Sequence, residues 1–236
     1  MKLIEIFYPI FLNLKGKLCV VIGGGQVAER KIEKLLSSQA VVKVIAPQIT
    51  SQIENWYKDQ RILWEKREYQ SGDLEGAWLA IAATNNPEVQ KKVAQEAEER
   101  KIFCNVIDQP SLGSFIVPSV IKRGDLILAI STSSASPAVS KRLREELEQI
   151  LGPEYKIYTE LMKNLREQIL KNEKLSPYEK ALKLQRLVMA PLVRYIKYKD
   201  FKLLEAILQK ENLRIPWEIF DSYFPNIISR ENEKQE

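Results

Sequence analysis

The sequence predicts an α/β protein whose N-terminal part forms a parallel sheet, followed by a β-hairpin with a helix and then by a C-terminal helical domain. Three observations carry this prediction. Short apolar runs alternate with helical patterns up to residue 113, two β-like runs then follow each other directly, and only helical patterns occur from residue 154 onward. The chain therefore combines one sheet-based domain with a smaller helical one.

Five apolar runs predict the strands of the sheet, at residues 18–22, 41–46, 62–64, 78–83 and 102–107. Between the first two, apolar residues at helical spacing from Val27 to Leu36 predict a helix. After the fourth run, Asn86 is placed as an N-cap and Pro87 as the first helical residue of another. Two βαβ units follow, and they indicate parallel strands.

The pattern changes after residue 113. Runs at 115–121 and 126–131 are separated only by four polar or glycine residues, which predicts a hairpin. Ser136 and Pro137 open a helix expected to run to about Leu151, and a second cap stands at Ser176 and Pro177. We expect a sheet domain at 1–113, a hairpin and helix at 114–151, a helical domain at 152–229 and a polar tail at 230–236.

Composition limits the classes of function. With 236 residues, 45% hydrophobic and 28% charged, the chain can bury a sizeable core, and no apolar run reaches the ~18 residues that span a bilayer. We expect a soluble, cytoplasmic protein without membrane partners. Cys19 and Cys104 each lie in an apolar run, which argues against disulfides.

The sequence has no histidine, so the commonest metal ligand and the commonest general base are both missing. Acid–base chemistry falls to carboxylates, Lys, Tyr or Cys, and no metal site is expected. The net charge of +5 is modest, and its basic residues are mixed with Glu along helices, which indicates solvated faces. It still favours a polyanionic substrate over a neutral one.

A glycine-rich turn directly follows the first predicted strand and opens the first predicted helix. Residues 23–28, Gly-Gly-Gly-Gln-Val-Ala, fit the pattern G-x-G-x-x-A of Rossmann domains. Gly23 would allow the tight turn, Gly25 the close approach of a pyrophosphate, and Ala28 close helix packing. The turn predicts a bound dinucleotide, and Gly24, between the other two glycines, is also expected to contact it. The alternative is a glycine turn in an α/β protein that binds no nucleotide.

The expected ribose-binding acid is absent. The second strand ends at Ala46 and is followed by Pro47 and Gln48. These residues alone therefore do not distinguish NAD from NADP as the cofactor. Thr84 and Asn85 follow the fourth strand, where cofactor is expected at a topological switch point; they could equally be ordinary turn and cap residues.

Four segments together resemble the precorrin-2 dehydrogenase and sirohydrochlorin ferrochelatase family, the N-terminal module of siroheme synthases. Their order and spacing match across roughly residues 5 to 150, and the C-terminal third matches only as a helical region. The chain ends without the methyltransferase domain of the trifunctional members, so methylation is not expected. The segments are Tyr8-Pro-Ile-Phe-Leu12, Gly23 to Lys31, Asn105-Val-Ile-Asp108, and Phe115-Ile-Val-Pro-Ser119 leading to Ser136-Pro137.

The resemblance implies the cofactor, the assembly and the functional residues. It implies NAD on the Rossmann domain, a homodimer built by the hairpin and its helix, and a helical domain that helps to close the tetrapyrrole cleft. The family's NAD contacts fall on Gln26 and Val27 and on Pro47 and Gln48. Its functional aspartate falls on Asp108.

Asp108 is also singled out by position, because an acid at the carboxyl end of a parallel strand faces the crevice where α/β enzymes work. Without histidine it is the best candidate for the general base that takes the proton as a hydride leaves precorrin-2. In members that also insert metal, the resemblance implies the same residue in handling Fe²⁺ or the pyrrole protons. The structural alternative is a strand-end turn former before Gln109.

The chain departs from the family in one loop, where Ser133 and Ser134 replace a common glycine pair. If those glycines serve positive φ angles, each serine costs about 1 kcal/mol or the turn changes. The loop hydroxyls could instead receive substrate carboxylates, or simply cap the helix. The candidate substrate contacts are Ser131, Thr132, Ser133, Ser134, Ser136 and Arg123. A cationic rim for the eight substrate carboxylates would add Lys122, Lys141, Arg142 and Arg144.

The sequence thus predicts NAD-dependent oxidation of precorrin-2 to sirohydrochlorin, and leaves open whether Fe²⁺ is then inserted. An NAD(H)-sensing regulatory module without catalysis is the alternative. Residues 154–229 show no clear basic recognition helix, so no nucleic acid partner is expected. A tetrapyrrole binder that has lost dehydrogenation is a third reading, which the intact glycine turn disfavours.

Overall fold

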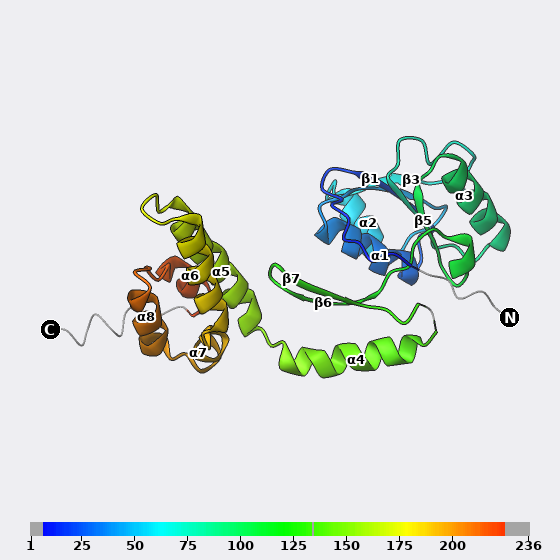
Figure 1. Cartoon of the computed structure of the whole chain (residues 1–236). Helices are drawn as coiled ribbons and strands as arrows, with labels where there is room; N and C mark the ends of the chain where they lie inside the picture. Colours follow the sequence, from blue (N-terminus) through cyan, green and yellow to red (C-terminus); the bar gives the residue numbers. More distant parts are fainter. Residues whose placement is uncertain (1–6, 134, 225–236) are drawn as a thin grey trace. The chain divides into compact units, whose positions relative to one another are not determined.

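The structure is a computed structural model that describes residues 7–133 and 135–224. The chain divides into two compact units (Figure 1). The first contains Met1–Val117 and Ser133–Ala135, and the second contains Pro118–Thr132 and Ser136–Glu236. The four-part division that we expect from the sequence stays a prediction.

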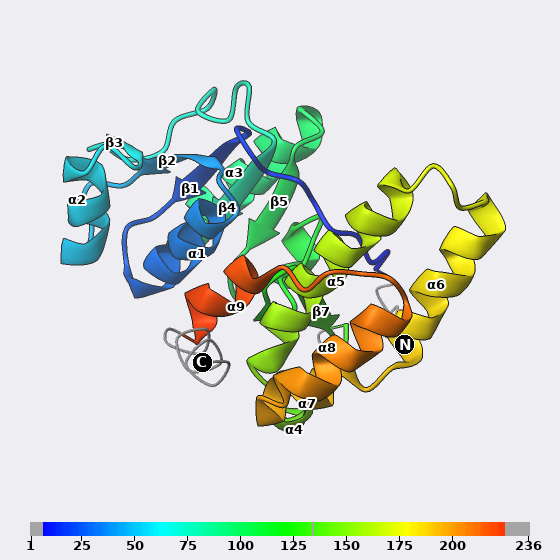
Figure 2. The ribbon, with the colours of Figure 1, turned by 90° about the vertical axis from the view of Figure 1, so that its left-hand side faces the viewer.

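The first unit is built on a five-stranded sheet whose strands all run parallel, which confirms the predicted α/β fold (Figure 2). The strand order is β3-β2-β1-β4-β5. The order reverses between β1 and β4, so their carboxyl ends form the switch point at which such sheets bind ligands. The strands are β1 (Leu18–Ile22), β2 (Val41–Ile45), β3 (Leu63–Glu65), β4 (Leu79–Ala82) and β5 (Phe103–Val106).

Helices cover both faces of the sheet. Side chains of β1 alternate between them: Cys19 and Val21 pack with α1 (Gln26–Ser37) and α2 (Ser51–Lys58), whereas Val20 and Ile22 pack with α3 (Pro87–Glu99). This double burial explains why β1 and β4 are unbroken apolar runs in the sequence. Helix α2, which is capped by Thr50, has no counterpart among the elements predicted from the sequence.

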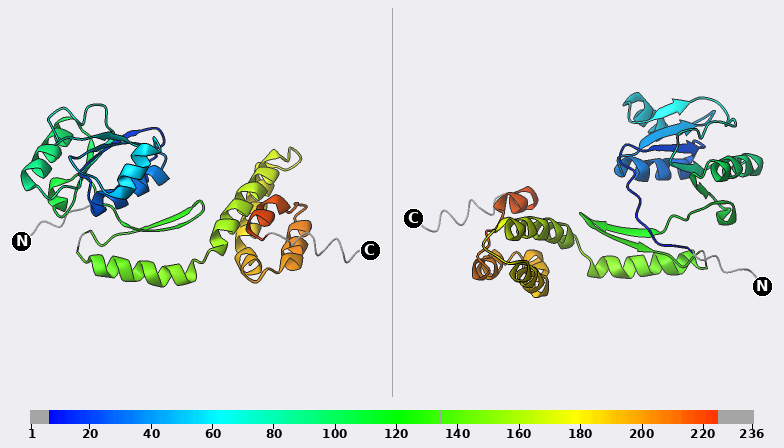
Figure 3. Two further views of the ribbon diagram at one scale, coloured as in Figure 1. Left: turned by 180° about the vertical axis from the view of Figure 1, so that it is seen from behind. Right: turned by 45° about the horizontal axis from the view of Figure 1, so that its top comes forward.

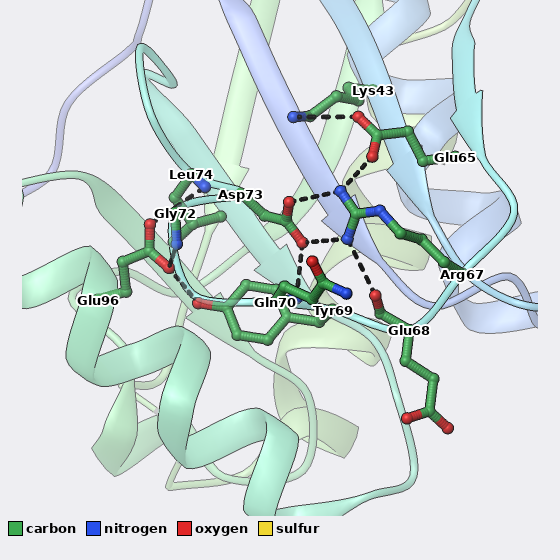
Figure 4. A network of polar contacts seen from close by, with 10 residues as sticks. All are labelled: Lys43, Glu65, Arg67, Glu68, Tyr69, Gln70, Gly72, Asp73, Leu74 and Glu96. Carbon is green, nitrogen blue, oxygen red and sulfur yellow. Dashed lines mark hydrogen bonds and ion pairs between the residues drawn. The ribbon is translucent and has the colours of Figure 1, made fainter.

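The connection from β3 to β4, residues 66–78, forms no helix and is fixed by polar contacts (Figure 4). The Arg67 guanidinium donates to both carboxylate oxygens of Asp73, at 2.6 and 2.7 Å. The buried Glu96 of α3 accepts from the Tyr69 hydroxyl and from the amide of Gly72, at 2.9 Å. These bonds replace the packing that a crossover helix would supply.

The second unit begins with a hairpin, β6 (Ser119–Arg123) and β7 (Leu126–Ile130), which packs along α4 (Pro137–Ile150) (Figure 1). The hairpin and α4 confirm the predicted elements, but the first strand begins at Ser119 and not at residue 115. Phe115 is held elsewhere, because its amide and that of Ser114 donate to the Cys104 carbonyl of β5. Pro118, which lacks an N–H, separates that segment from the strand.

Within the described part of the second unit, up to residue 224, five more helices follow α4 (Figure 3). The apolar faces of these helices form a separate hydrophobic core in the second unit around Leu161, Leu165 and Leu204, which are all fully buried. The predicted cap at Ser176 is present as a capping box with Glu179. The end of the predicted helical domain and the predicted polar tail, from 225 on, lie outside the described residues. The helices are α5 (Glu154–Lys171), α6 (Pro177–Met189), α7 (Leu192–Tyr198), α8 (Phe201–Lys210) and α9 (Trp217–Tyr223).

Among the residues that the structure describes, no helix has the combination of length and apolar character that crossing a membrane requires.

Candidate functional site

The first two glycines of the turn after β1 are required by the protein's own backbone. Gly23 has φ +120°, and a Cβ there would lie 2.2 Å from the carbonyl oxygen of Ala83 at the end of β4. A Cβ on Gly24 would lie 2.0 Å from the carbonyl oxygen of Gln48. These two positions therefore let three chain segments meet at the switch point.

Gly25 differs, because no contact or backbone angle among the described residues requires a glycine there. Its φ is −82°, which any residue adopts, and a Cβ there would meet no atom within 4 Å. It is the N-cap of α1 and makes no side-chain capping bond. The next residues, Gln26 and Val27, begin the helix, whose first amides point outward by geometry. This open, backbone-lined helix start fits a phosphate group.

The loop after β2 is anchored beside the glycine turn. The Thr50 amide donates to the Gly24 carbonyl at 3.0 Å, and the Thr50 hydroxyl donates to Glu29 on α1 at 2.5 Å. Pro47 and Gln48 are both exposed, and the Gln48 carbonyl is the group that crowds Gly24. The structure thus brings the two predicted cofactor segments together.

Thr84 and Asn85 follow β4 at the same edge of the sheet. Thr84 is half-buried, and its hydroxyl accepts from the Asn86 amide at 3.3 Å. Asn85 is exposed, while Asn86 accepts from the amides of Glu88 and Val89 and so caps α3. Thr84 therefore shapes the turn as well as standing at the predicted cofactor position.

Asp108 stands two residues beyond β5 with its side chain exposed and with φ +63°. Aspartate tolerates this left-handed conformation better than most residues. Its neighbour Ile107 is fixed at both ends: the amide donates to the Ala82 carbonyl of β4 at 3.0 Å, and the carbonyl accepts from the Gln90 side chain at 3.2 Å. Asp108 and the glycine turn thus follow strands of one sheet at their carboxyl ends.

Sequence reasoning gave no role to Gln90, which joins the loops after β4 and β5. This α3 residue is 5% exposed. Its Nε2 donates to the carbonyls of Thr84 at 2.7 Å and Ile107 at 3.2 Å, and its Oε1 accepts from Gln109 at 2.7 Å. The available signal was an amide residue one turn after a helix start, which is too common to single out.

Asn105 carries the unsatisfied polar atom of this region. It lies in β5 and is 7% exposed, and its Nδ2 donates to the Phe115 carbonyl at 3.0 Å. Its Oδ1 has no hydrogen-bond partner within the described part of the chain. A buried acceptor without a donor is costly and calls for an explanation. In the sequence, an amide residue inside an apolar strand run is the signal for such a group, and Asn105 stands out there only as part of the family motif.

The serine-rich loop is organised by Thr132. Its hydroxyl donates to the Ser136 carbonyl at 3.0 Å, accepts from the Ser136 amide at 3.1 Å, and lies 3.2 Å from the hydroxyl of the buried Ser140. Ser133 has φ +49°, so a serine holds a conformation that glycine adopts more easily, at a cost of about 1 kcal/mol. Ser134 lies outside the described residues.

Arg123 is engaged inside the second unit. Its Nε donates to the Leu151 carbonyl at the end of α4, at 2.9 Å. Of the predicted cationic rim, the three α4 residues each have an acidic partner one turn away, which favours the solvated-face alternative. The pairs are Lys141 with Glu145, Arg142 with Glu146, and Arg144 with Glu148.

The predicted site residues fall into both units. The glycine turn, the two loops beside it and Asp108 belong to the first, whereas Thr132, Ser136 and Arg123 belong to the second. Ser131 is also part of the second unit, and Ser133 part of the first. Within residues 7–133 and 135–224 no three acidic or thiol side chains cluster as a metal site would require.

Comparison with known proteins agrees with this geometry. Residues 10–119 match a family model described as "Putative NAD(P)-binding". Siroheme synthase 2 of Pectobacterium atrosepticum is 42% identical over 145 residues, 61% of this chain and 32% of the relative. Siroheme synthase 2 of Klebsiella pneumoniae is 44% identical over 143 residues, 61% of this chain and 31% of the relative. The chain therefore spans about a third of the length of these relatives.

A solved structure, SirC, a precorrin-2 dehydrogenase, matches with a TM-score of 0.69 and 28% identity. The match covers 83% of this chain and 100% of that one. The resemblance that the sequence motifs predict is confirmed by these findings. The regulatory alternative receives no support from them.

Proposed function

We propose, from the confirmed likeness of this chain to the precorrin-2 dehydrogenase family, that it oxidises precorrin-2 to sirohydrochlorin with NAD⁺ as the oxidant. The observation that carries the proposal is the placement of two features at one edge of one sheet. The glycine turn follows β1, and the exposed carboxylate of Asp108 follows β5. A dinucleotide site and an acid–base group are what such a dehydrogenation needs.

The residues around the turn fit a dinucleotide. Gly25 leaves room for a pyrophosphate against the first amides of α1, those of Gln26 and Val27. Pro47 and Gln48 would contact the ribose through their backbone, since no acid is present there. Thr84 and Asn85 would flank the nicotinamide end. When bound, NAD⁺ supplies the hydride acceptor.

Asp108 would hold the proton that leaves as the substrate loses a hydride. Precorrin-2 loses both in the reaction, so the products are sirohydrochlorin, NADH and one proton. The side chain is exposed and lies outside the apolar core, so it can reach a bound tetrapyrrole and pass the proton to water. Asn105 lies in β5, the strand that Asp108 follows, and its Oδ1 has no partner among the described residues. This oxygen could accept a hydrogen bond from an N–H group of the cofactor or the substrate.

Iron insertion would use the same carboxylate. Fe²⁺ is then a substrate, and two pyrrole protons must leave as it enters. Asp108 would accept them in turn, and this part of the proposal is tested separately by adding Fe²⁺ or Co²⁺ to purified sirohydrochlorin. An absorbance spectrum that does not change on metal addition would restrict the chain to dehydrogenation.

A homodimer through the hairpin and α4 belongs to the same proposal. A two-stranded sheet is marginal by itself. The outward face of the hairpin includes Val120 and Ile127, which are 40% and 41% exposed. Helix α4 is also largely exposed, and Ser140 is its buried residue within the described chain. Val139, Leu143 and Ile150 of α4 are 40–66% exposed. A second copy would cover these apolar side chains. The unpaired, buried cysteines fit the reducing cytoplasm as its place of action.

The test is anaerobic incubation with precorrin-2 and NAD⁺ or NADP⁺, followed by the absorbance of NADH and sirohydrochlorin. We expect turnover with NAD⁺. Asp108→Asn is the sharpest variant, because asparagine keeps the left-handed backbone but cannot take the proton. It should suppress turnover while the Kd for NAD⁺ stays near that of the wild type. No reduced cofactor with either dinucleotide would overturn the proposal.

A further inference from the structure

We propose that Gln90 is a positioning residue for Asp108, an inference that rests on the dehydrogenase function proposed above. The side-chain amide of Gln90 offers neither an acid nor a base. Its side chain binds the residues on both sides of Asp108: Nε2 donates to the Ile107 carbonyl at 3.2 Å, and Oε1 accepts from Gln109 at 2.7 Å. Asp108 is thereby bracketed by one side chain.

The hydrogen bond from Gln90 to the Ile107 carbonyl also fixes the orientation of the peptide group before Asp108. Its carbonyl belongs to the peptide unit that joins Ile107 to Asp108, so a donor on that oxygen sets the plane of the peptide. Asp108 has φ +63°, a conformation that costs energy for a residue with a Cβ and persists where the surroundings impose it. The Ile107 amide is held by Ala82 at 3.0 Å, so the approach to Asp108 is constrained at both ends.

The same side chain reaches the loop after β4. Nε2 of Gln90 donates to the Thr84 carbonyl at 2.7 Å, so one amide group binds both loops. Gln90 is 5% exposed and uses both donor hydrogens and its acceptor, so its place in α3 determines where the two loops stand. Catalytic groups lose activity when displaced by about 1 Å, which makes such a support important for turnover.

Gln90→Met keeps the length and volume of the side chain and removes its donors. Gln95→Met is the matched control, because Gln95 lies on the same helix but is exposed, and its Nε2 donates to the side chain of Glu99 at 2.9 Å. In the anaerobic assay we expect Gln90→Met to lower kcat by ~10- to 100-fold while KM changes much less. Gln95→Met should leave both constants unchanged.

A double-mutant cycle separates positioning from general destabilisation. If Gln90 acts through Asp108, then Gln90→Met in the Asp108→Asn background should cause no further loss of kcat. An equal loss in both backgrounds would assign Gln90 a merely structural role and overturn the inference.

Gln109→Ala keeps the inference testable if Gln90→Met does not fold. It removes one bond on the far side of Asp108, and we expect kcat to fall by ~3- to 10-fold. An active wild type whose kcat is unchanged by Gln109→Ala and by any folded Gln90→Met overturns this inference alone. A wild type without turnover overturns the proposed function, and this inference with it.

Discussion

The carbonyl oxygen of Ala83 lies where a side chain on Gly23 would begin, at 2.2 Å from an ideal Cβ. The contact joins the ends of β1 and β4, so neither backbone can move without shifting a strand. Gly23 also has φ +120°, which L residues rarely adopt. Gly23→Ala should therefore lower the free energy of unfolding by about 2–4 kcal/mol. Urea denaturation followed by circular dichroism measures this, and a variant as stable as the wild type would contradict the geometry.

Gly25→Ala should behave in the opposite way. The site is open and its φ of −82° suits alanine, so the melting temperature should stay within about 2 °C of the wild type. The new methyl group would occupy the space that we assign to the pyrophosphate. Affinity for NAD⁺ should fall about tenfold or more, as measured by calorimetry. Unchanged affinity would mean that the cofactor does not approach this glycine.

Stability should depend on pH through Glu96. Burial alone would raise the pKa of this carboxyl, but hydrogen bonds from Tyr69, Gly72 and Leu74 and the ion pair with Arg100 outweigh it and hold the pKa below its usual 4.5. A pKa lowered by folding means that the carboxylate stabilises the protein above pH 4.5, and that this stabilisation is lost as the pH falls through the folded-state pKa.

Glu96→Gln should accordingly lower the free energy of unfolding at pH 7 by about 1–3 kcal/mol. The difference from the wild type should shrink as the pH falls through the lowered folded-state pKa of Glu96, because both proteins then carry a neutral group. Glu98→Gln on the exposed side of the same helix is the control and should have little effect at either pH. A difference that stays constant from pH 7 down to the acid unfolding of the wild type would show that charge at position 96 is unimportant.

Assembly can be tested at the hairpin. Ile127 is 41% exposed on the outward face of β7, and Ile127→Glu would place a charge in the proposed dimer interface. Sedimentation velocity should find the wild type as a dimer and the variant as a monomer. Val188→Glu, at a 59% exposed position on α6, should remain dimeric. A monomeric wild type would contradict the dimer directly.

The sequence determined the elements of the sheet well because their signals are local. Alternating apolar runs gave the strands, and Asn86 with Pro87 gave the start of α3. The first hairpin strand was placed too early, since Phe115 has strand character but is bound to the Cys104 carbonyl. Helix α2 was overlooked because it spans eight residues, too short for a clear helical period.

The candidate site was less accessible to sequence reasoning. The glycine motif identifies Gly23 and Gly25 as candidates, and the position after a predicted strand identifies Asp108. The contacts of Gln90 and the unpaired oxygen of Asn105 depend on residues brought together across the sheet. No spacing along the chain encodes those contacts, so they emerged only from the three-dimensional arrangement.

The bonds of Gln90 have a consequence for how this protein can evolve. Two of its three partners are main-chain carbonyls, those of Thr84 and Ile107. These two bonds from α3 therefore depend on where the backbone lies and not on which side chains residues 84 and 107 carry. Substitutions at residue 84 can alter what the loop offers to a ligand while the frame beneath it is retained. Variation in ligand preference can thus accumulate without a loss of architecture.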